Sequence, residues 1–167
     1  LPVQAVTART YDSRDRVITQ TDPTGVTTTT TYDGGGLPIQ ITTASGKSVA
    51  ITYDANGNRL QTITAPGTPE QTISSTTYDS RNRVVTSTDG AGSVTTMTYD
   101  PLGRTLTVKN ALNHTTTYTY DLAGNLLTTK DADNVVTSTR TYDALNRLST
   151  EKDGKNQTIS YQYNALG

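Results

Sequence analysis

The chain has 167 residues and a formal net charge of −1, so it has no electrostatic attraction for nucleic acid or anionic membranes. Threonine fills 37 positions, and the absence of cysteine excludes disulfides and thiolate metal sites. No apolar run approaches the roughly 20 residues of a membrane helix. Threonine and tyrosine favour extended backbone, and the scarcity of large aliphatic residues argues against a thick core, so we predict an all-β chain.

The pair Tyr-Asp recurs at spacings of 21, 21, 25, 21, 21 and 22 residues, and Tyr163-Asn164 follows 21 residues after the last pair. Such regular self-similarity indicates a tandem repeat. We expect a single repeat array over residues 1–167, and a piece of a longer protein because the last copy is incomplete. Its units start at residues 11, 32, 53, 78, 99, 120, 142 and 163.

The first turn of each unit opens at the residue after the tyrosine and closes three residues later. Every closing residue is of a type that tolerates a positive φ, and the opening Asp can accept a hydrogen bond from the backbone two residues on. This pattern predicts a type I turn followed by a left-handed residue, a common hairpin loop. The closing residues are Asp15, Gly36, Gly57, Asn82, Gly103, Gly124, Asn146 and Gly167.

A second turn of the same kind lies about ten residues after the first. The third unit is four residues longer, and Pro66 and Pro69 predict an enlarged loop around residues 67–71. The closing residues of the second turns are Gly25, Gly46, Gly67, Gly92, Asn113, Asn134 and Asn156.

The residues between the turns alternate in polarity, as expected of a sheet with unlike faces. Seven residues after each Tyr the side chain is apolar in six of seven units, and eight residues after it the side chain is Thr or Gln. We predict tandem β-hairpins that form a continuous, curved antiparallel sheet of about fourteen strands. One face should carry the repeat tyrosines together with Ile51, Met97, Tyr118 and Tyr161.

The pattern Tyr-Asp-x-x-Gly-Arg, clearest at residues 99–104, resembles the YD-repeat or Rhs family over essentially the whole chain. The resemblance implies a β-ribbon wound into a hollow shell, as in bacterial Rhs proteins, toxin-complex cocoon components and teneurins. In bacterial members the shell encloses a toxic C-terminal domain, so we expect a secreted or cell-surface bacterial protein. Leu37, Asn58 and Asn125 depart from the pattern, because they replace the Arg after the first turn.

The repeated Tyr-Asp residues are expected to be structural: each Tyr packs against the next unit, and each Asp caps a turn. A catalytic group is needed once, whereas these residues recur in every unit. We therefore predict no enzyme and no catalytic, cofactor-binding or metal-binding residue. The structural residues are Tyr11, Asp12, Tyr32, Asp33, Tyr53, Asp54, Tyr78, Asp79, Tyr99, Asp100, Gly103, Tyr120, Asp121, Gly124, Tyr142, Asp143 and Tyr163.

Other candidate residues also favour a structural interpretation. His114 lies beside a turn without a catalytic motif, and residues 131–134 occupy a turn without the Gly and Glu of a calcium loop. N-glycan acceptor patterns at Asn113 and Asn156 coincide with turn-closing residues. One column of arginines could lie over Tyr rings: Arg16, Arg83, Arg104 and Arg147. A second column, of lysines, could form a solvated stripe: Lys109, Lys130 and Lys152.

These observations predict a non-catalytic scaffold, a wall segment that encloses or displays toxin or other domains. Its partners would be other repeats of the same or a larger chain and an enclosed toxin domain, without nucleic acid or a membrane span. The alternative is an extracellular module for adhesion or self-assembly. In that case open sheet edges would join copies end to end, or exposed Tyr and Thr columns would bind glycans.

Overall fold

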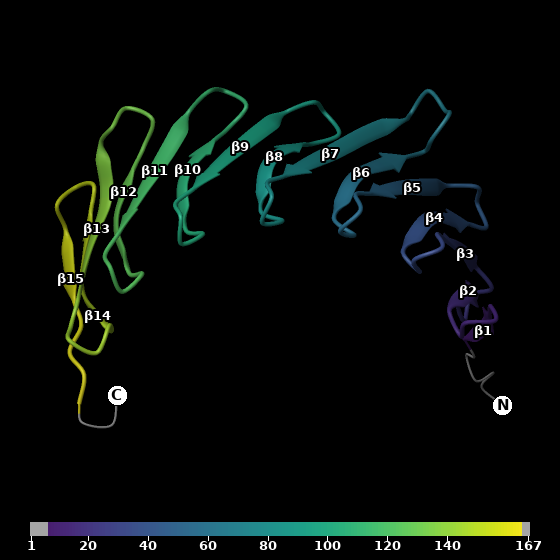
Figure 1. The fold of residues 1–167 in the computed structure, drawn as a ribbon, viewed down its shortest axis with the longest axis horizontal. Helices are drawn as coiled ribbons and strands as arrows, with labels where there is room; N and C mark the ends of the chain where they lie inside the picture. Colours follow the sequence, from purple (N-terminus) through teal and green to yellow (C-terminus); the bar gives the residue numbers. More distant parts are fainter. Residues whose placement is uncertain (1–6, 165–167) are drawn as a thin grey trace. The chain divides into compact units, whose positions relative to one another are not determined.

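The computed structural model describes residues 7–164, which form 15 β-strands and contain no helix, hence none that could cross a membrane (Figure 1). The all-β prediction is therefore confirmed, with one strand more than the expected fourteen. The chain divides into two compact units, residues 1–92 and 93–167. Within each unit the strands lie in sequence order, and each strand is antiparallel to its neighbours.

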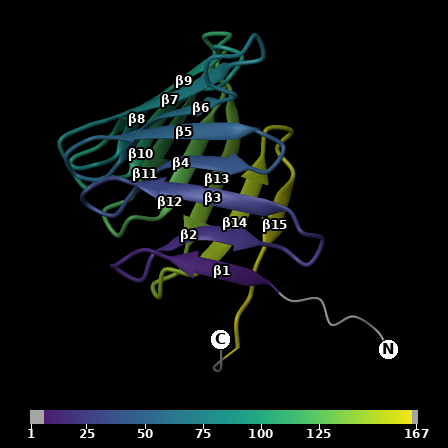
Figure 2. The ribbon, with the colours of Figure 1, turned by 90° about the vertical axis from the view of Figure 1, so that its right-hand side faces the viewer.

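The first unit is a meander of eight strands. Figure 2 shows β1 to β5 one beside the next in chain order. In Figure 1, β7 is seen lengthwise whereas β1 and β2 are seen nearly end-on, which reflects the twist expected of adjacent strands. The strands are β1 (Ala8–Tyr11), β2 (Val17–Thr21), β3 (Thr27–Tyr32), β4 (Pro38–Thr43), β5 (Ser48–Tyr53), β6 (Arg59–Thr64), β7 (Thr72–Tyr78) and β8 (Val84–Thr88).

The second unit repeats the meander with seven strands. Its hairpins are built on the same two kinds of turn, and its last strand is the shortest of the described strands. The strands are β9 (Val94–Tyr99), β10 (Thr105–Lys109), β11 (Thr115–Tyr120), β12 (Leu126–Lys130), β13 (Val136–Tyr142), β14 (Leu148–Asp153) and β15 (Thr158–Ser160).

The turns have the predicted geometry. In the first hairpin the Asp15 N–H donates to the Asp12 carbonyl at 3.1 Å, and the Asp12 N–H donates to the Arg16 carbonyl at 2.9 Å. The Asp12 carboxylate accepts the backbone N–H groups of Arg14 and Arg16 at 2.8 and 3.0 Å. Each predicted closing residue within the described range has a positive φ, from 57° at Asp15 to 97° at Gly124, whereas Gly167 lies outside the described residues.

Each first hairpin contains a β-bulge that the sequence analysis did not anticipate. Thr10 pairs with Thr19 and Tyr11 pairs with Val17, so Ile18 is an extra residue without a cross-strand partner. The same shift in strand register occurs at every repeat tyrosine of the described strands. The predicted apolar column is therefore the column of bulge residues: Ile18, Ile39, Leu60, Val85, Leu106, Leu127 and Ser149.

The sheet has two unlike faces, as predicted. The threonine face carries the Thr that precedes each repeat Tyr of the described strands. This Thr pairs across the hairpin with the residue eight positions after the Tyr, as Thr10 pairs with Thr19. In five hairpins the two hydroxyl groups are hydrogen-bonded at 2.6–2.7 Å, as between Thr119 and Thr128. The tyrosine face carries the repeat tyrosines with residues such as Ile51 and Met97, and the Tyr99 hydroxyl lies 3.5 Å from the Met97 sulfur.

The sheet has almost no core. Among the described residues, only Ile51 and Asp100 are buried, with 5% and 8% of their surface exposed. Such burial of apolar surface contributes little at about 25 cal/mol per Å². Main-chain ladders and side-chain contacts between neighbouring strands must therefore supply most of the stability.

The enlarged loop of the third unit is confirmed between β6 and β7. It consists of two consecutive turns, in which the Thr68 N–H donates to the Ala65 carbonyl and the Gln71 N–H donates to the Thr68 carbonyl. The Gln71 side chain also accepts the Gly67 N–H at 2.8 Å. The two prolines leave this segment without a strand, so the extra residues are accommodated outside the ladder.

We expect Gly103→Val to destabilise the chain much more than Ser80→Val. Gly103 has a φ of 90°, where a β-branched side chain costs about 1–3 kcal/mol. Ser80 is an exposed turn residue outside the positive-φ set. Thermal unfolding followed by circular dichroism measures the difference, and equal midpoints for the two variants would contradict the turn assignment.

Candidate functional site at the junctions between hairpins

The ladder between successive hairpins is shorter than the ladder within a hairpin. Strands β2 and β3 pair only through Thr19, Gln20 and Thr21, close to the second turn. Three residue pairs likewise join β4 to β5, β10 to β11, β12 to β13 and β14 to β15. Towards the first turn the ladder stops, so the carbonyl group at the start of β2 lacks a main-chain partner from β3.

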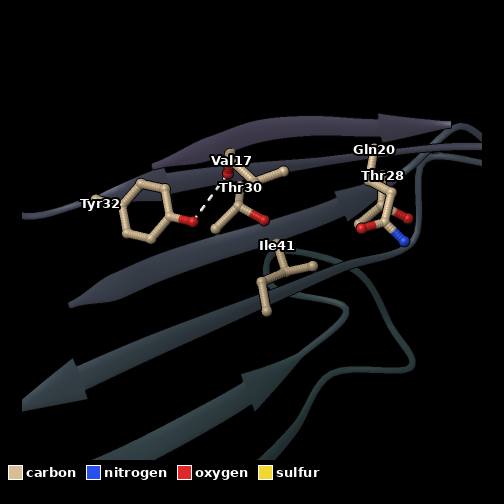
Figure 3. A pocket seen from close by; sticks show the side chains of 6 residues that line it. All are labelled: Val17, Gln20, Thr28, Thr30, Tyr32 and Ile41. Atoms are coloured by element: carbon tan, nitrogen blue, oxygen red, sulfur yellow. Dashed lines mark hydrogen bonds between the residues drawn. The ribbon is translucent and has the colours of Figure 1, made fainter. Parts of the chain in front are cut away.

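The repeat tyrosine replaces the missing ladder. The Tyr32 hydroxyl donates to the Val17 carbonyl at 2.8 Å, across the gap between β2 and β3 (Figure 3). In six such bonds the acceptor is the residue six positions after the tyrosine of the preceding copy, next to the bulge residue. The same bond joins Tyr53 to Pro38, Tyr78 to Arg59, Tyr120 to Thr105, Tyr142 to Leu126 and Tyr163 to Leu148, at 2.9–3.1 Å.

Where an arginine follows the first turn, it makes a second contact with the next hairpin. Arg104 pairs with Asp100 of its own turn at 2.6 Å and donates to the Asp121 carbonyl of the next turn at 2.6 Å. Its guanidinium carbon lies 4.8 Å from the centre of the Tyr120 ring. Arg16 lies over Tyr32 and Arg147 over Tyr163 at 4.6 and 4.3 Å, which confirms the expected Arg–Tyr contact in three hairpins.

These contacts lower the pKa of several aspartates in the first turns and so favour their charged state. The Arg83 guanidinium bonds to Asp79 at 2.6 Å and lowers the pKa of that carboxyl to about 2. Side-chain amides lower the pKa of Asp54 and Asp121 in the same direction. Burial raises the pKa of Tyr120, so its hydroxyl stays protonated and remains a donor.

Asn58 and Asn125, which depart from the family pattern, perform the task of the arginine with a shorter side chain. The Asn125 amide donates to Asp121 of its own turn and to the Asn146 side chain of the next turn, both at 2.9 Å. Asn58 likewise bonds to Asp54 and to Asn82 at 2.9 and 2.7 Å. The departures therefore keep the bridge between copies and change only its chemistry.

In each pair of consecutive copies, the residue that follows the first turn of one copy correlates with the residue that closes the first turn of the next copy. Where it is Asn, the next copy closes with Asn, whose side chain accepts its amide. Where it is Arg or Leu, the next copy closes with Gly; a Cβ at Gly36 would lie 3.6 Å from the Arg16 guanidinium. The matched pairs are Asn58–Asn82 and Asn125–Asn146, and Arg16–Gly36, Leu37–Gly57, Arg83–Gly103, Arg104–Gly124 and Arg147–Gly167.

A cleft lies beside Tyr32 on the tyrosine face of the first unit. Its volume is about 310 Å³, and Val17, Gln20, Thr28, Thr30, Tyr32 and Ile41 line it (Figure 3). These side chains supply hydroxyl and amide groups and no general base or metal ligand set. Within residues 7–164 no group of His, Asp and Glu side chains is arranged to hold a metal ion.

The remaining candidates lie where a structural role places them. His114 is exposed, and its main chain closes the second turn through Asn110 at 2.9 and 3.0 Å. The acceptor asparagines Asn113 and Asn156 are exposed turn residues with φ of 64° and 66°. Strand alternation places Lys109, Lys130 and Lys152 on the threonine face, in register with Thr96, Thr117 and Thr139.

Sequence comparison agrees with the repeat geometry. The RHS repeat family matches residues 11–48, and the Teneurin YD-shell family matches residues 75–166, more than half of the chain. The chain belongs to the YD-repeat shell family. This confirms the resemblance found in the Tyr-Asp motifs. No curated protein sequence matches the chain.

Two solved structures share the fold of this YD-repeat chain. A TcdB2–TccC3–Cdc42 complex is 19% identical and has a TM-score of 0.71 over 86% of the chain. The Tc holotoxin pore of Photorhabdus luminescens is also 19% identical, with a TM-score of 0.70 over 92% of the chain. In both cases the present chain spans only 9% of the length of the solved chain.

Removing one bridging hydroxyl should weaken the YD-repeat sheet measurably. Tyr120→Phe deletes the bond to the Thr105 carbonyl, which we expect to cost about 1 kcal/mol. Tyr11→Phe is the matched control, since Tyr11 is 53% exposed and water can satisfy its hydroxyl. Urea denaturation compares the two variants, and an unchanged midpoint for Tyr120→Phe would refute the bridging role.

A double-mutant cycle tests the matching of neighbouring turns. Asn125→Ala and Asn146→Gly each remove one partner of the amide bridge, and Gly keeps the positive φ of 61° at position 146. We expect a coupling free energy of about 0.5–1.5 kcal/mol from urea denaturation. The control cycle combines Asn125→Ala with Asn134→Gly, a second-turn position, and should be additive; equal coupling in both cycles would exclude a specific bridge.

Proposed function

We propose that the chain is a wall segment of a YD-repeat shell and has a mechanical, non-catalytic role. The observation that carries this proposal is the bridge between hairpins, which recurs in copy after copy with the same Tyr, Asp and Arg or Asn positions. A building element is needed at every junction, whereas a catalytic group is needed once. Apart from Asp22, whose pKa is lowered by Thr24 within a second turn, the side chains with perturbed pKa values belong to the first turns and these repeated bridges.

The expected partners follow from the shell architecture. Other repeats of the same or a larger chain would continue the sheet, and a toxin domain of the same protein would lie inside the shell. The fold shared with Tc toxin complexes supports an enclosed domain as the kind of partner. A secreted or cell-surface location in a bacterium is part of the same proposal.

Glycan binding has less support than the wall. A carbohydrate platform needs an open aromatic face, yet the Tyr32, Tyr120 and Tyr163 rings lie under guanidinium groups. Their hydroxyl groups are also committed to carbonyl groups of the preceding hairpin. The repeated tyrosines therefore serve the junctions between copies.

End-to-end assembly is the second candidate function, and a specific observation favours it. Strands β1 and β15 are exposed along their whole length, and each has a ladder partner on one side only among the described strands. Free N–H and C=O groups on such edges can pair with a strand of another chain.

Negative-stain electron microscopy over a concentration series separates the two functions. A wall segment should give discrete particles, single chains or closed pairs, that do not lengthen into filaments as the concentration rises. Filaments that lengthen as the concentration rises would overturn the wall proposal and support an extracellular fibre. Thioflavin binding is a useful accompanying control, because it distinguishes native strand pairing from amyloid formed by unfolded chains.

A further inference from the structure

The tips of the first turns differ between the two compact units. In the first unit the two central turn residues are polar or small, and Arg14 and Arg81 place charges there. In the second unit the central residues of three consecutive first turns are all apolar. We call these residues the leucine edge: Pro101, Leu102, Leu122, Ala123, Ala144 and Leu145.

The leucines of this edge are among the most exposed apolar side chains of the described residues. Leu102, Leu122 and Leu145 are 73%, 102% and 71% exposed. Single exposed leucines are ordinary on protein surfaces, but large apolar side chains at the same turn of three successive hairpins form a row. Nothing in the turn itself requires leucine, since the first unit makes the same turn with Ser, Gly, Ala, Asn and Arg.

The charges beneath the leucine edge are largely neutralised. Asp100 and Asp143 form ion pairs with Arg104 and Arg147 at 2.6 and 2.8 Å. The Asp121 carboxylate accepts the Asn125 amide and backbone N–H groups. A partner that approaches the edge therefore meets apolar tips without having to strip water from unpaired charges.

The spacing of the row restricts which partner fits. Consecutive first turns are two strands apart, so their tips repeat about every 10 Å, and the gap between two tips can receive one tip of an opposing row. An opposing row must have the same period to interdigitate along its length. A second set of hairpins from the same kind of repeat meets that condition.

We propose that the leucine edge is an interface that packs against another leucine-tipped edge of the same repeat type. The inference deepens the proposed wall function, because a ribbon becomes a continuous wall only where its edges meet. The length of the related chains supports this occupant: the present chain spans 9% of each, so one shell chain can hold many such runs. For the isolated chain, the available partner is a second copy.

Analytical ultracentrifugation of the 167-residue chain tests the interface. We expect a reversible dimer whose dissociation constant rises about tenfold or more in the triple variant L102E/L122E/L145E, since each of the two copies would then bring three carboxylates to the interface. The matched control S13E/A55E/S80E changes the first turns of the first unit and should leave association unchanged. A monomer at all concentrations, or equal effects of both triple variants, would overturn the proposal.

Cysteine cross-linking gives an independent readout, because the natural chain has no cysteine. Leu122→Cys should form an intermolecular disulfide faster than Ala55→Cys, which occupies the corresponding turn position in the first unit. Equal rates would contradict the interface. A folded chain that stays monomeric in the ultracentrifuge and forms discrete particles under the electron microscope refutes the leucine-edge interface alone. Filaments that lengthen with concentration refute the wall function. The two proposals can therefore fail separately.

Discussion

The structure depends on the hydroxyl groups that six repeat tyrosines place against a carbonyl of the preceding hairpin. Between hairpins the ladder covers only the half near the second turn, and an unpaired carbonyl would be costly in the other half. The Tyr120 hydroxyl meets this need at Thr105, and the guanidinium of Arg104 then covers the Tyr120 ring. Consecutive hairpins are thus joined by main-chain hydrogen bonds near the second turns and by side-chain bonds near the first turns.

This division explains how a sheet with almost no buried core can be specified. Within residues 7–164 Ile51 is the only buried apolar residue, so burial cannot select one arrangement over another. Instead, each junction is defined by directional bonds between named side chains, and each copy interacts with its neighbours in sequence. Stability of this kind is approximately a sum over copies and junctions, as in other repeat proteins.

The sequence predicted the turns well because their requirement is local. Left-handed backbone favours Gly, Asn and Asp because of their own side chains, and Gly103, Asn82 and Asp15 all have the positive φ expected, whereas Ala65 in the enlarged loop, with a φ of 49°, was not foreseen. The two faces also followed from alternation, and the prolines of the third unit marked its loop correctly. These properties depend on residues within a few positions of each other.

Apart from the bulge, what the sequence did not reveal depends on partners 15 to 24 residues away. The bulge was hidden because the apolar column at Ile18 fits a strand that alternates normally, although adjacent apolar residues such as Val17-Ile18 and Leu126-Leu127 break the alternation and are a usable signal. Asn58 and Asn125 looked like exceptions until their amides were found on Asn82 and Asn146. Whether one array forms over residues 1–167 remains a prediction, since the chain divides into two compact units.

The matching of Asn with Asn, and of Arg with Gly, has a consequence for how such genes change. Tandem copies are prone to loss by unequal recombination, which keeps the reading frame when one whole copy is deleted. Loss of the copy that starts at Tyr78 would place Asn58 beside Gly103, which offers its amide no oxygen, and loss of the copy at Tyr120 would place Arg104 beside Asn146. The two copies joined by an Asn–Asn bridge therefore belong together, because separating them leaves one amide without its partner even though every copy has the same fold.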